Sequence, residues 1–406
     1  MEKLVIHGGH PLRGHVRVSS AKNAVLPIIV ATLLPETPAS IVDTPNLDDV
    51  VTICSVLESL GVKVQREDNV LTFDASGVNK TEASYELMSR MRASFLIMGP
   101  LLAKMGHAKI ALPGGCMIGS RPIDLHLKAF EAMGAEINVG NGYVEGYAPK
   151  GLKGTTIYLD FPSVGATENI LMAAATAEGR TIIENAAEEP EIVDLVTFLN
   201  SMGANIKGAG TNIIRVEGVK KLEGVAHTVI PDRIEAGTFM IAAAMAGDVV
   251  IENVLNEHLK PLLAKLGEAG VKVIKDVDSV RVISDGHIRS TDIKTLPYPG
   301  FPTDLQAQFM ALMTVGSGIT ETVFENRFMH AGELQRMGAS IQVEGRCAIV
   351  QGVPFLTGAF VRATDLRAGA ALTLAGLAAH GETEVGELHH IDRGYDHLVE
   401  KLQGLG

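Results

Sequence analysis

Met133-Gly134-Ala135-Glu136-Ile137 is one copy of a short pattern that returns along the whole chain: an aliphatic residue, a glycine, Ala or Val, and the start of a strand-like run. The glycine recurs at positions 61, 203, 270, 338 and 406, at separations of 67 to 73 residues. A fixed period of this size is typical of a repeated architecture. The sequence therefore predicts an α/β protein built from six copies of one repeat.

Each repeat has two halves. The first is an apolar helix followed by a small-residue turn and a short strand, and because such helices are apolar almost all round we expect them to be buried. The second is an amphipathic helix, such as 47–60 or 193–202, that ends at the repeat glycine and leads into a hairpin. The expected buried helices are 23–34, 93–104, 167–177, 236–246, 305–315 and 368–380, and the expected hairpins are 62–75, 135–148, 204–217, 271–284 and 339–351.

The two ends of the chain complement each other. The sixth repeat reaches Gly406 before any hairpin, and the segment 4–18 is predicted to be a free hairpin that completes the last three repeats. The chain would then pass twice between two lobes, 22–228 and 1–21 with 229–406. Two passages make a hinge, and a cleft between lobes is a usual place for a ligand.

Composition narrows the class of protein. Apolar residues make up 46% of the 406 residues, enough for large cores. The formal net charge of −12 argues against a nucleic-acid partner, which needs a basic surface. The N-terminus lacks the apolar stretch of a signal peptide, and the apolar runs are too short to cross a bilayer. We therefore expect a cytoplasmic protein without a membrane partner.

The three cysteines differ in their surroundings. Their irregular spacing predicts neither a disulfide framework nor a zinc site. Cys54 lies on an apolar helical stripe and Cys347 follows a hairpin turn, so both are predicted to be structural. Cys116 lies in a Gly- and Pro-rich loop, five residues before Arg121. An arginine there favours the thiolate and can bind phosphate in a bidentate fork; the alternative is a surface turn with an incidental thiol.

The expected buried helices carry polar residues at their starts. A helix N-terminus favours anions, so a cation there is unfavourable unless an anion is bound. Lys22, Arg92 and Arg367 occupy such positions, and we infer an anion-binding cleft on which the helix starts converge. For other polar residues a plain helix cap is the alternative. That alternative applies to Ser163, Asp232, Thr303 and Asp365.

Metal and nucleotide motifs are not recognised in the sequence. His389 and His390 are adjacent, and on a strand their side chains would point to opposite faces. The other histidines form no ligand pattern, and neither a GxGxxG nor a Walker A pattern occurs. We therefore predict no metal site and no cofactor.

Several longer motifs coincide with the helix starts and with the Cys116 loop. They are 20–24, 91–94, 113–126, 163–167, 184–187, 231–233, 301–308, 321–330, 364–368 and 390–395. At these residues the sequence resembles the UDP-N-acetylglucosamine enolpyruvyl transferases. The resemblance implies two lobes, each of three βαβαββ-type repeats, that form an inside-out α/β barrel with the N-termini of its buried helices at the inter-lobe cleft.

The resemblance also implies a reaction. The enolpyruvyl group of phosphoenolpyruvate would pass to the 3-hydroxyl of UDP-N-acetylglucosamine through a tetrahedral ketal, with loss of phosphate, as the first committed step of peptidoglycan synthesis. Cys116 would protonate the enol methylene carbon and could form a covalent phospholactoyl adduct. Asp304 would be the base for the hydroxyl. The epoxide fosfomycin would alkylate Cys116. An obligate protein partner is not implied.

Two sets of binding residues follow. Those for phosphoenolpyruvate are Lys22, Asn23, Arg121 and Arg393, to which the helix-start argument adds Arg367. Those for the sugar nucleotide are Arg92, Arg121, Pro122, Ile123, Asp124, Leu125, Ser163, Val164, Gly165, Asp304 and Val323. Lys22 and Arg393 join Cys116 and Asp304 as expected catalytic residues.

Three other functions stay open at this point. An enolpyruvyl transferase for shikimate 3-phosphate has the same fold and co-substrate, but its members lack the Cys116 loop. A catalytically silent UDP-sugar sensor is opposed by the intact set of Lys22, Cys116, Asp304 and Arg393. An RNA-end-processing enzyme of related repeat architecture fits poorly with the net charge of −12.

Overall fold

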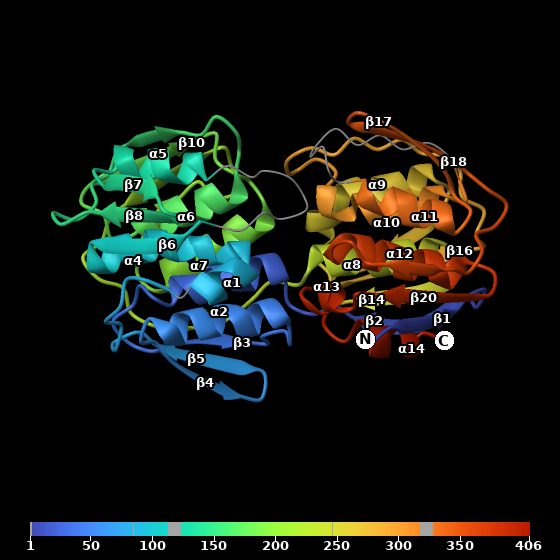
Figure 1. Cartoon of the computed structure of the whole chain (residues 1–406), viewed down its shortest axis with the longest axis horizontal. Helices are drawn as coiled ribbons and strands as arrows, with labels where there is room; N and C mark the ends of the chain where they lie inside the picture. The colour runs from blue at the N-terminus through green and yellow to red at the C-terminus, as the bar shows by residue number, and fades with distance from the viewer. Residues whose placement is uncertain (1, 84, 113–122, 246, 317–327) are drawn as a thin grey trace. The chain divides into compact units, whose positions relative to one another are not determined.

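The computed structural model describes residues 2–83, 85–112, 123–245, 247–316 and 328–406. These residues form two compact lobes (Figure 1). Lobe A comprises 20–112 and 123–230, and lobe B comprises 2–19 with the described residues from 231 to 406. The predicted boundaries of 22–228 and 1–21 with 229–406 lie close to these limits. That the lobes move about a hinge stays a prediction.

Lobe A contains three copies of the repeat. The first is α1 (Lys22–Ala31), β3 (Ala39–Val42), α2 (Asp48–Ser59), β4 (Lys63–Glu67) and β5 (Val70–Asp74). The second is α3 (Tyr85–Arg90), η1 (Arg92–Ile97), α4 (Met98–Met105), β6 (His107–Ala111), α5 (Asp124–Ala132), β7 (Glu136–Gly140) and β8 (Tyr143–Tyr147). The third is β9 (Thr156–Tyr158), α6 (Val164–Ala174), β10 (Arg180–Glu184), α7 (Pro190–Ser201), β11 (Asn205–Lys207) and β12 (Ile213–Glu217), followed by β13 (Ala226–Thr228).

Lobe B contains the other three copies and the N-terminal strands β1 (Leu4–His7) and β2 (Leu12–Arg17). The fourth copy is α8 (Arg233–Met245), β14 (Gly247–Glu252), η2 (Asn256–Leu259), α9 (Lys260–Glu268), β15 (Lys272–Lys275) and β16 (Ser279–Ser284). The fifth has η3 (Thr303–Leu305), α10 (Gln306–Met313), α11 (Met329–Arg336), β17 (Ser340–Glu344) and β18 (Cys347–Gln351). The sixth has β19 (Phe360–Arg362), α12 (Leu366–Ala378), β20 (Glu382–Gly386), α13 (His389–Asp392) and α14 (Leu398–Gln403).

Among the described residues, the three four-stranded sheets repeat one pattern. A hairpin pairs antiparallel with the strand that follows the buried helix, and a parallel strand lies on that strand's other edge, as in the order β11-β12-β10-β9. In two repeats the parallel strand comes from a distant part of the chain. β13 lies beside β3, and β2 lies beside β14. Pairing of distant segments therefore ties the first and last parts of lobe A together and ties the N-terminal segment of lobe B to its fourth repeat.

The N-terminal segment corrects one prediction. Residues 4–18 do not form a hairpin, because β1 pairs antiparallel with β20 and β2 pairs parallel with β14. The segment thus supplies strands to the sixth and fourth repeats. This arrangement buries Ile6, Leu12 and Val16 in the core of lobe B, whereas an isolated two-stranded hairpin is only marginally stable in water.

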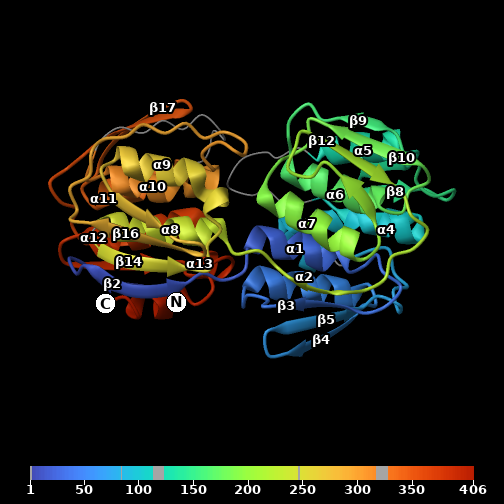
Figure 2. The ribbon, with the colours of Figure 1, turned by 180° about the vertical axis from the view of Figure 1, so that it is seen from behind.

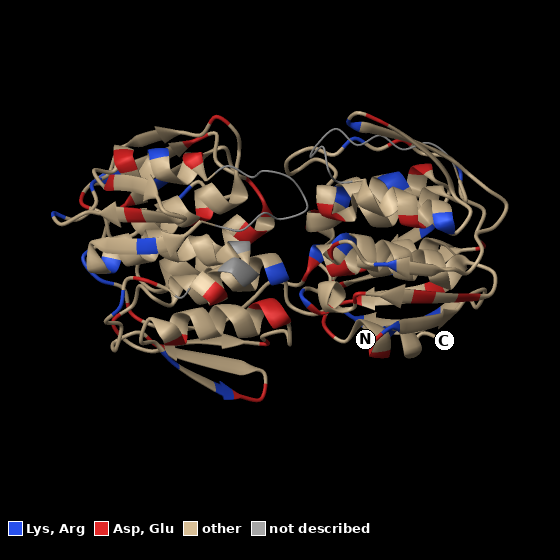
Figure 3. Cartoon of the chain, viewed as in Figure 1, with Lys and Arg blue, Asp and Glu red and all other residues tan. Residues whose placement is uncertain are grey.

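Each lobe has its own hydrophobic core around its buried helices. In α8 every residue from 234 to 245 is buried, and the sheets lie outside the helices, as Figures 1 and 2 show. In α1, α6 and α12 the charged residues lie in the first half of the helix, at Lys22, Glu168 and Arg367, whereas α4 has Lys104 in its last turn. Figure 3 shows the charged residues of the chain in blue and red among the uncharged residues in tan. The predicted buried, apolar helices with polar starts are confirmed.

Within the described residues, the chain passes between the lobes at 19–20 and at 230–231. The N–H of Ala21 donates to the carbonyl of Ile230 at 2.8 Å, and the N–H of Asp232 donates to the carbonyl of Ser19, also at 2.8 Å. Within each lobe, therefore, a backbone hydrogen bond holds the incoming and outgoing segments side by side.

Glycines two residues before a parallel strand permit a close backbone approach. A Cβ at Gly154 would lie 2.3 Å from the carbonyl oxygen of Arg180, and one at Gly358 would lie 2.1 Å from that of Glu382. Gly224, before β13, is crowded in the same way. Since the obstructing atoms are backbone, a side chain at these positions would force two segments apart.

We predict that Gly358→Ala lowers the free energy of unfolding by about 2–3 kcal/mol, as expected for a forced backbone shift. Gly267→Ala is the matched control, because Gly267 lies in α9 with open space at its Cβ position. That change should stabilise the protein by about 0.5–1 kcal/mol through helix propensity. Urea unfolding of both variants tests this, and equal stabilities would contradict the role given to Gly358.

Candidate active site

Three helix starts of lobe B lie together, because α8, α10 and α12 pack against one another. Asp232 caps α8, its Oδ1 accepting from the N–H groups of Ile234 (2.8 Å) and Glu235 (3.0 Å). Asp365 caps α12 in the same way, accepting from Arg367 at 2.8 Å and Ala368 at 3.1 Å. Both side chains therefore act as helix caps, the alternative considered above.

Thr303 differs from these caps. Its hydroxyl oxygen is buried without a hydrogen-bond partner, and Pro302 precedes η3 at the cap position. The interpretation of Thr303 as a plain helix cap is therefore wrong. Ser163 does cap α6, its Oγ accepting from the N–H of Ala166 at 3.2 Å.

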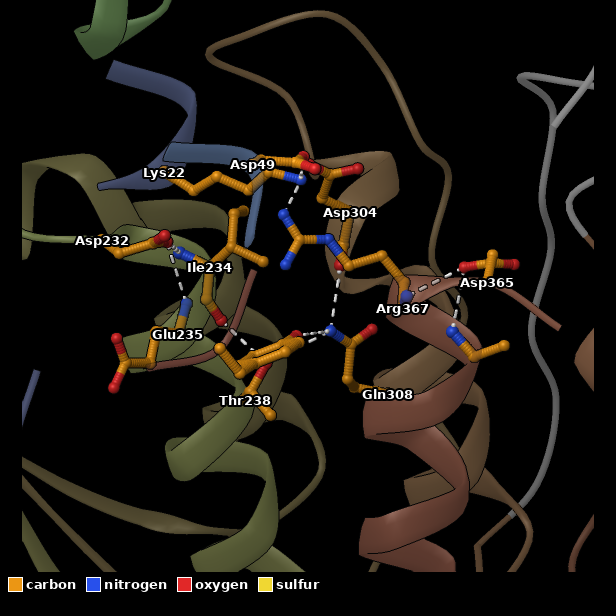
Figure 4. A network of polar contacts seen from close by, with 12 residues as sticks. Lys22, Asp49, Asp232, Ile234, Glu235, Thr238, Asp304, Gln308, Asp365 and Arg367 are labelled. Carbon is orange, nitrogen blue, oxygen red and sulfur yellow. Dashed lines mark hydrogen bonds and ion pairs between the residues drawn. The ribbon is translucent and has the colours of Figure 1, made fainter. Parts of the chain in front are cut away.

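Arg367 and Asp304 form a partly buried ion pair at these helix starts (Figure 4). Nη2 of Arg367 lies 3.1 Å from Oδ2 of Asp304, and the two side chains are 5% and 25% exposed. Burial alone would lower the pKa of Arg367, but the neighbouring Asp304, Tyr395 and Asp232 together outweigh it and raise that pKa. The guanidinium is thus permanently charged. Its Nη1 is buried without a hydrogen-bond partner, so its N–H groups can donate to a further anionic oxygen.

Lys22 occupies the equivalent helix start in lobe A. Its Nζ lies 2.8 Å from Oδ2 of Asp49, and the side chains are only 12% and 5% exposed. Asn23 follows Lys22 in the first turn of α1. Asp49 was not identified from the sequence, although its signal is present: it lies four residues before Ile53, on the buried face of α2.

The Lys22–Asp49 and Arg367–Asp304 ion pairs alter the reason for expecting a bound anion. The sequence predicts an anion at these helix starts because a cation there opposes the helix dipole. Here Asp49 offsets the charge of Lys22, and Asp304 offsets that of Arg367. A bound anion is therefore not needed to explain the cations, and the evidence for an anion site is instead the unpartnered Nη1 of Arg367.

A buried asparagine, Asn169, connects the other helices of lobe A near their starts. Asn169 of α6 donates to the carbonyl of Phe95 at 3.2 Å, lies 3.0 Å from Nδ1 of His126, and accepts from the N–H of Gly99 at 2.8 Å. It therefore links α5, α6 and the helix that begins at Arg92. Five residues expected to bind the sugar nucleotide begin α5 and α6. They are Ile123, Asp124, Leu125, Val164 and Gly165.

Glu168 lies one turn below Ser163 in α6. It is 4% exposed, and its Oε1 is buried without a hydrogen-bond partner. Burial, followed by the nearby carboxylates of Glu191 and Glu189, raises the pKa of Glu168 well above its usual range. The side chain therefore tends to hold a proton at a pH at which an exposed glutamate is ionised.

Several expected site residues lie outside the described structure. Cys116, Arg121 and Pro122 fall in 113–122, and Val323 falls in 317–327. Arg92 begins η1, and Arg393 directly follows α13. Asp304 and Arg367 are thus the predicted pair that the described part of lobe B brings into contact.

The structure also shows the surroundings of the other two cysteines and of the adjacent histidines. Cys54 is partly buried against the core, and its burial raises the thiol pKa to about 12. Cys347 is exposed at the start of β18. His389 and His390 lie in a helical turn, with ring centroids 4.1 Å apart, so the expectation that they lie on opposite faces of a strand is wrong. Among the described residues, no group of three or more His, Cys, Asp or Glu could hold a metal ion.

No helix in the described part of the chain is both long enough and apolar enough to cross a membrane.

Comparison with known proteins supplies the family. The family model "EPSP synthase (3-phosphoshikimate 1-carboxyvinyltransferase)" matches residues 6–402. A UDP-N-acetylglucosamine 1-carboxyvinyltransferase 2 of Carboxydothermus hydrogenoformans is 62% identical over 412 residues, which span all of this chain and 98% of the relative. The chain belongs to the enolpyruvyl transferase family.

Solved structures of this family have the same fold. The enolpyruvyl transferase NikO from Streptomyces tendae, 28% identical, superposes with a TM-score of 0.89 over all of this chain and 97% of its own. An EPSP synthase from Acinetobacter baumannii, 19% identical, gives 0.77 over all of this chain and 98% of its own. The chain is therefore a transferase with the two-lobed α/β fold of the enolpyruvyl transferases.

We predict that Glu168→Gln alters how the stability of this enolpyruvyl transferase depends on pH. Because the folded-state pKa of Glu168 is raised, its contribution is fully present below about pH 4.5 and is lost as the pH rises toward the folded pKa. The loss is at most about 1.4 kcal/mol per pH unit. Glutamine lacks this term, so the variant should gain on the wild type between pH 5 and pH 8 in urea unfolding.

The exposed Glu178, also in lobe A, provides the control for that experiment. Glu178→Gln should leave the stability difference from wild type nearly constant across the same range. Parallel pH curves for the wild type and Glu168→Gln would show that Glu168 ionises in the folded protein as it does in the unfolded chain.

Proposed function

We propose that the chain transfers the enolpyruvyl group of phosphoenolpyruvate to the 3-hydroxyl of UDP-N-acetylglucosamine and releases phosphate, as the first committed step of peptidoglycan synthesis. The observation that carries the proposal is the 62% identity, over the whole chain, to a relative whose name specifies that acceptor. The buried Arg367 with its unpartnered Nη1 supports an anionic substrate in lobe B.

The proposed reaction has two steps. In the addition, the sugar 3-oxygen bonds to C2 of phosphoenolpyruvate, the hydroxyl proton passes to a base, and C3 gains a proton, which gives a tetrahedral ketal. In the elimination, C3 loses a proton and the C2–O bond to phosphate breaks, so the double bond is restored. Both substrates are anionic, and cations that hold the phosphate and carboxylate lower the barrier to these steps.

Four residues are given chemical roles in the proposal. Asp304 is the base for the sugar hydroxyl. Its side chain is a quarter exposed and its Oδ2 is held by Arg367, so the carboxylate is both fixed in place and accessible to a substrate. Cys116 is the acid for C3 and the site of the covalent adduct. Lys22 and Arg393 neutralise the phosphoryl group as it leaves.

The binding residues are divided between the two substrates. Those proposed for phosphoenolpyruvate are Lys22, Asn23, Arg121, Arg367 and Arg393. Those proposed for the sugar nucleotide are Arg92, 121–125, 163–165, Asp304 and Val323. The link through Asn169 beneath α5 and α6 supports a rigid platform for the second set.

The decisive experiment measures phosphate release from phosphoenolpyruvate with UDP-N-acetylglucosamine and, separately, with shikimate 3-phosphate. Release with the sugar nucleotide alone, blocked by fosfomycin, is the expected result. Release with shikimate 3-phosphate alone would overturn the acceptor but retain the family. UDP-sugar binding without any turnover would instead indicate a silent sensor.

We predict that Cys116→Ala abolishes turnover and fosfomycin labelling, while UDP-N-acetylglucosamine binding stays within about threefold of wild type, because the thiol acts in proton transfer rather than in sugar binding. Cys347→Ala is the matched control, since Cys347 is the exposed thiol at the start of β18. Labelling is read by mass spectrometry and binding by calorimetry. Turnover at the wild-type rate in Cys116→Ala would rule out the acid role.

We predict that Asp304→Asn lowers kcat by about 100-fold or more, the usual effect of removing a general base. The KM for the sugar nucleotide should change much less, because an asparagine keeps the shape and hydrogen-bonding capacity of the side chain. Steady-state kinetics with Asp285→Asn, an exposed aspartate of lobe B, as control checks this. A change confined to KM would reduce Asp304 to a binding residue.

A further inference from the structure

A single phenol lies at the meeting point of the three helix starts in lobe B. Tyr395 is 3% exposed. Its hydroxyl is 3.0 Å from Oγ1 of Thr238 in α8 and accepts from Nε2 of Gln308 in α10 at 3.0 Å. Its ring faces the guanidinium of Arg367 in α12, with Cζ 5.5 Å from the ring centroid. Tyr395 therefore contacts all three helices that carry the expected site residues of this lobe.

The direction of this hydrogen-bond chain follows from its two ends. The hydroxyl of Thr238 donates to the carbonyl of Ile234 at 2.8 Å, and a carbonyl can only accept. The proton of Thr238 is thus committed, so the hydroxyl of Tyr395 donates to Thr238. The oxygen of Tyr395 is then left to accept from Gln308, and the polar groups align in the order Gln308, Tyr395, Thr238, Ile234.

Gln308 connects this chain to the candidate base. Its Nε2 also donates to the backbone carbonyl of Asp304 at 3.0 Å. An amide nitrogen has two protons, so bonds to Asp304 and Tyr395 use both. The 3.2 Å approach of the same nitrogen to Thr238 is then a secondary contact. Fixing Gln308 therefore fixes the backbone of the residue that carries the reacting carboxylate.

Tyr395 also contacts the guanidinium of Arg367. Burial raises the pKa of the Tyr395 hydroxyl, and the Arg367 charge partly opposes that rise, so the phenol stays neutral while its ring packs against the guanidinium. Tyr395 lies two residues after Arg393, and its N–H donates to the carbonyl of Ile391, two residues before Arg393, at 3.1 Å. The same residue therefore steadies the segment that carries a second proposed phosphate-binding arginine.

We propose that Tyr395, acting with Gln308, is a positioning residue that sets the orientation of Asp304 and Arg367 for the transfer reaction, an inference that rests on the proposed function. Neither residue needs to touch substrate. Without the phenolic hydroxyl, Gln308 loses one of its two acceptors, and the hold on Asp304 loosens. A displacement of the order of 1 Å at a reacting group can reduce turnover by about 100-fold.

The test compares kcat and KM for Tyr395→Phe, Gln308→Met and the double variant. Tyr395→Phe removes one hydroxyl and keeps the ring against Arg367, and we expect kcat to fall about tenfold with the sugar-nucleotide KM nearly unchanged. Because the two residues act as one chain, the double variant should lose little more than the worse single variant. Thr238→Val, which removes the final hydroxyl of the chain, should lower kcat in the same direction.

Thr373→Val is the matched structural control. Thr373 lies in α12, the helix that carries Arg367, and is 1% exposed; its hydroxyl donates to the carbonyl of Gly369 in the same helix, at 2.9 Å. Its loss should lower the melting temperature about as much as Tyr395→Phe does, with kcat unchanged. A Tyr395→Phe enzyme with a lower melting temperature but a kcat within twofold of wild type would overturn the positioning role.

The wild-type assay separates this inference from the function on which it rests. If the wild type releases no phosphate with UDP-N-acetylglucosamine, the proposed function fails and the inference fails with it. If the wild type turns over and the Tyr395→Phe, Gln308→Met and Thr373→Val variants all have wild-type kcat, the function stands and only the inference is overturned.

Discussion

A helix that is apolar on every side can be buried along its length only if its polar residues are placed at its ends. This constraint organises both lobes, since the bodies of α1, α6, α8, α10 and α12 lie in the cores and their charged residues lie in the first turns or just before them, apart from Glu168, which follows the first turn of α6. The same turns leave N–H groups without helical partners. Packing three such helices together in lobe B therefore gathers polar and charged groups at one end of an apolar core.

Cations at helix starts are electrostatically unfavourable, and in this protein neighbouring carboxylates compensate their charge. A lysine or arginine there opposes the helix dipole and loses hydration. Asp49 compensates Lys22, and Asp304 compensates Arg367, each at hydrogen-bonding distance. The compensation for Arg367 is incomplete, because Nη1 is left without a partner. An anionic substrate that supplied the missing oxygen would complete the coordination of a guanidinium already held in place, with little further loss of side-chain freedom.

The repeat period predicted much of this architecture because it depends on local patterns. Five hairpins and six buried helices follow from apolar runs and the glycines that end them, and Asp304 and Arg367 stood out as charges at helix starts. Contacts between repeats did not follow, because the period relates equivalent positions and not the side chains that meet. The 4–18 segment was misread since two strands joined by a turn have the same pattern whether they pair with each other or with β20 and β14. Asp49 was missed because two adjacent acids, Asp48 and Asp49, in the first turn of a helix look like solvent-facing residues.

The position of Tyr395 shows how a repeated fold acquires a specific site. Three equivalent helix starts offer three similar frameworks, and a phenol from outside the buried helices joins Thr238 of one, Gln308 of the next and Arg367 of the third. Among the residues that the structure describes, none of these contacts recurs at the equivalent positions of the other repeats. The helices supply a stable, apolar scaffold that tolerates a buried charge, and the aperiodic cross-links decide which way that charge and its carboxylate partner point. On this argument the shared fold sets where the chemistry can occur, while residues such as Tyr395 set how accurately its groups are aligned.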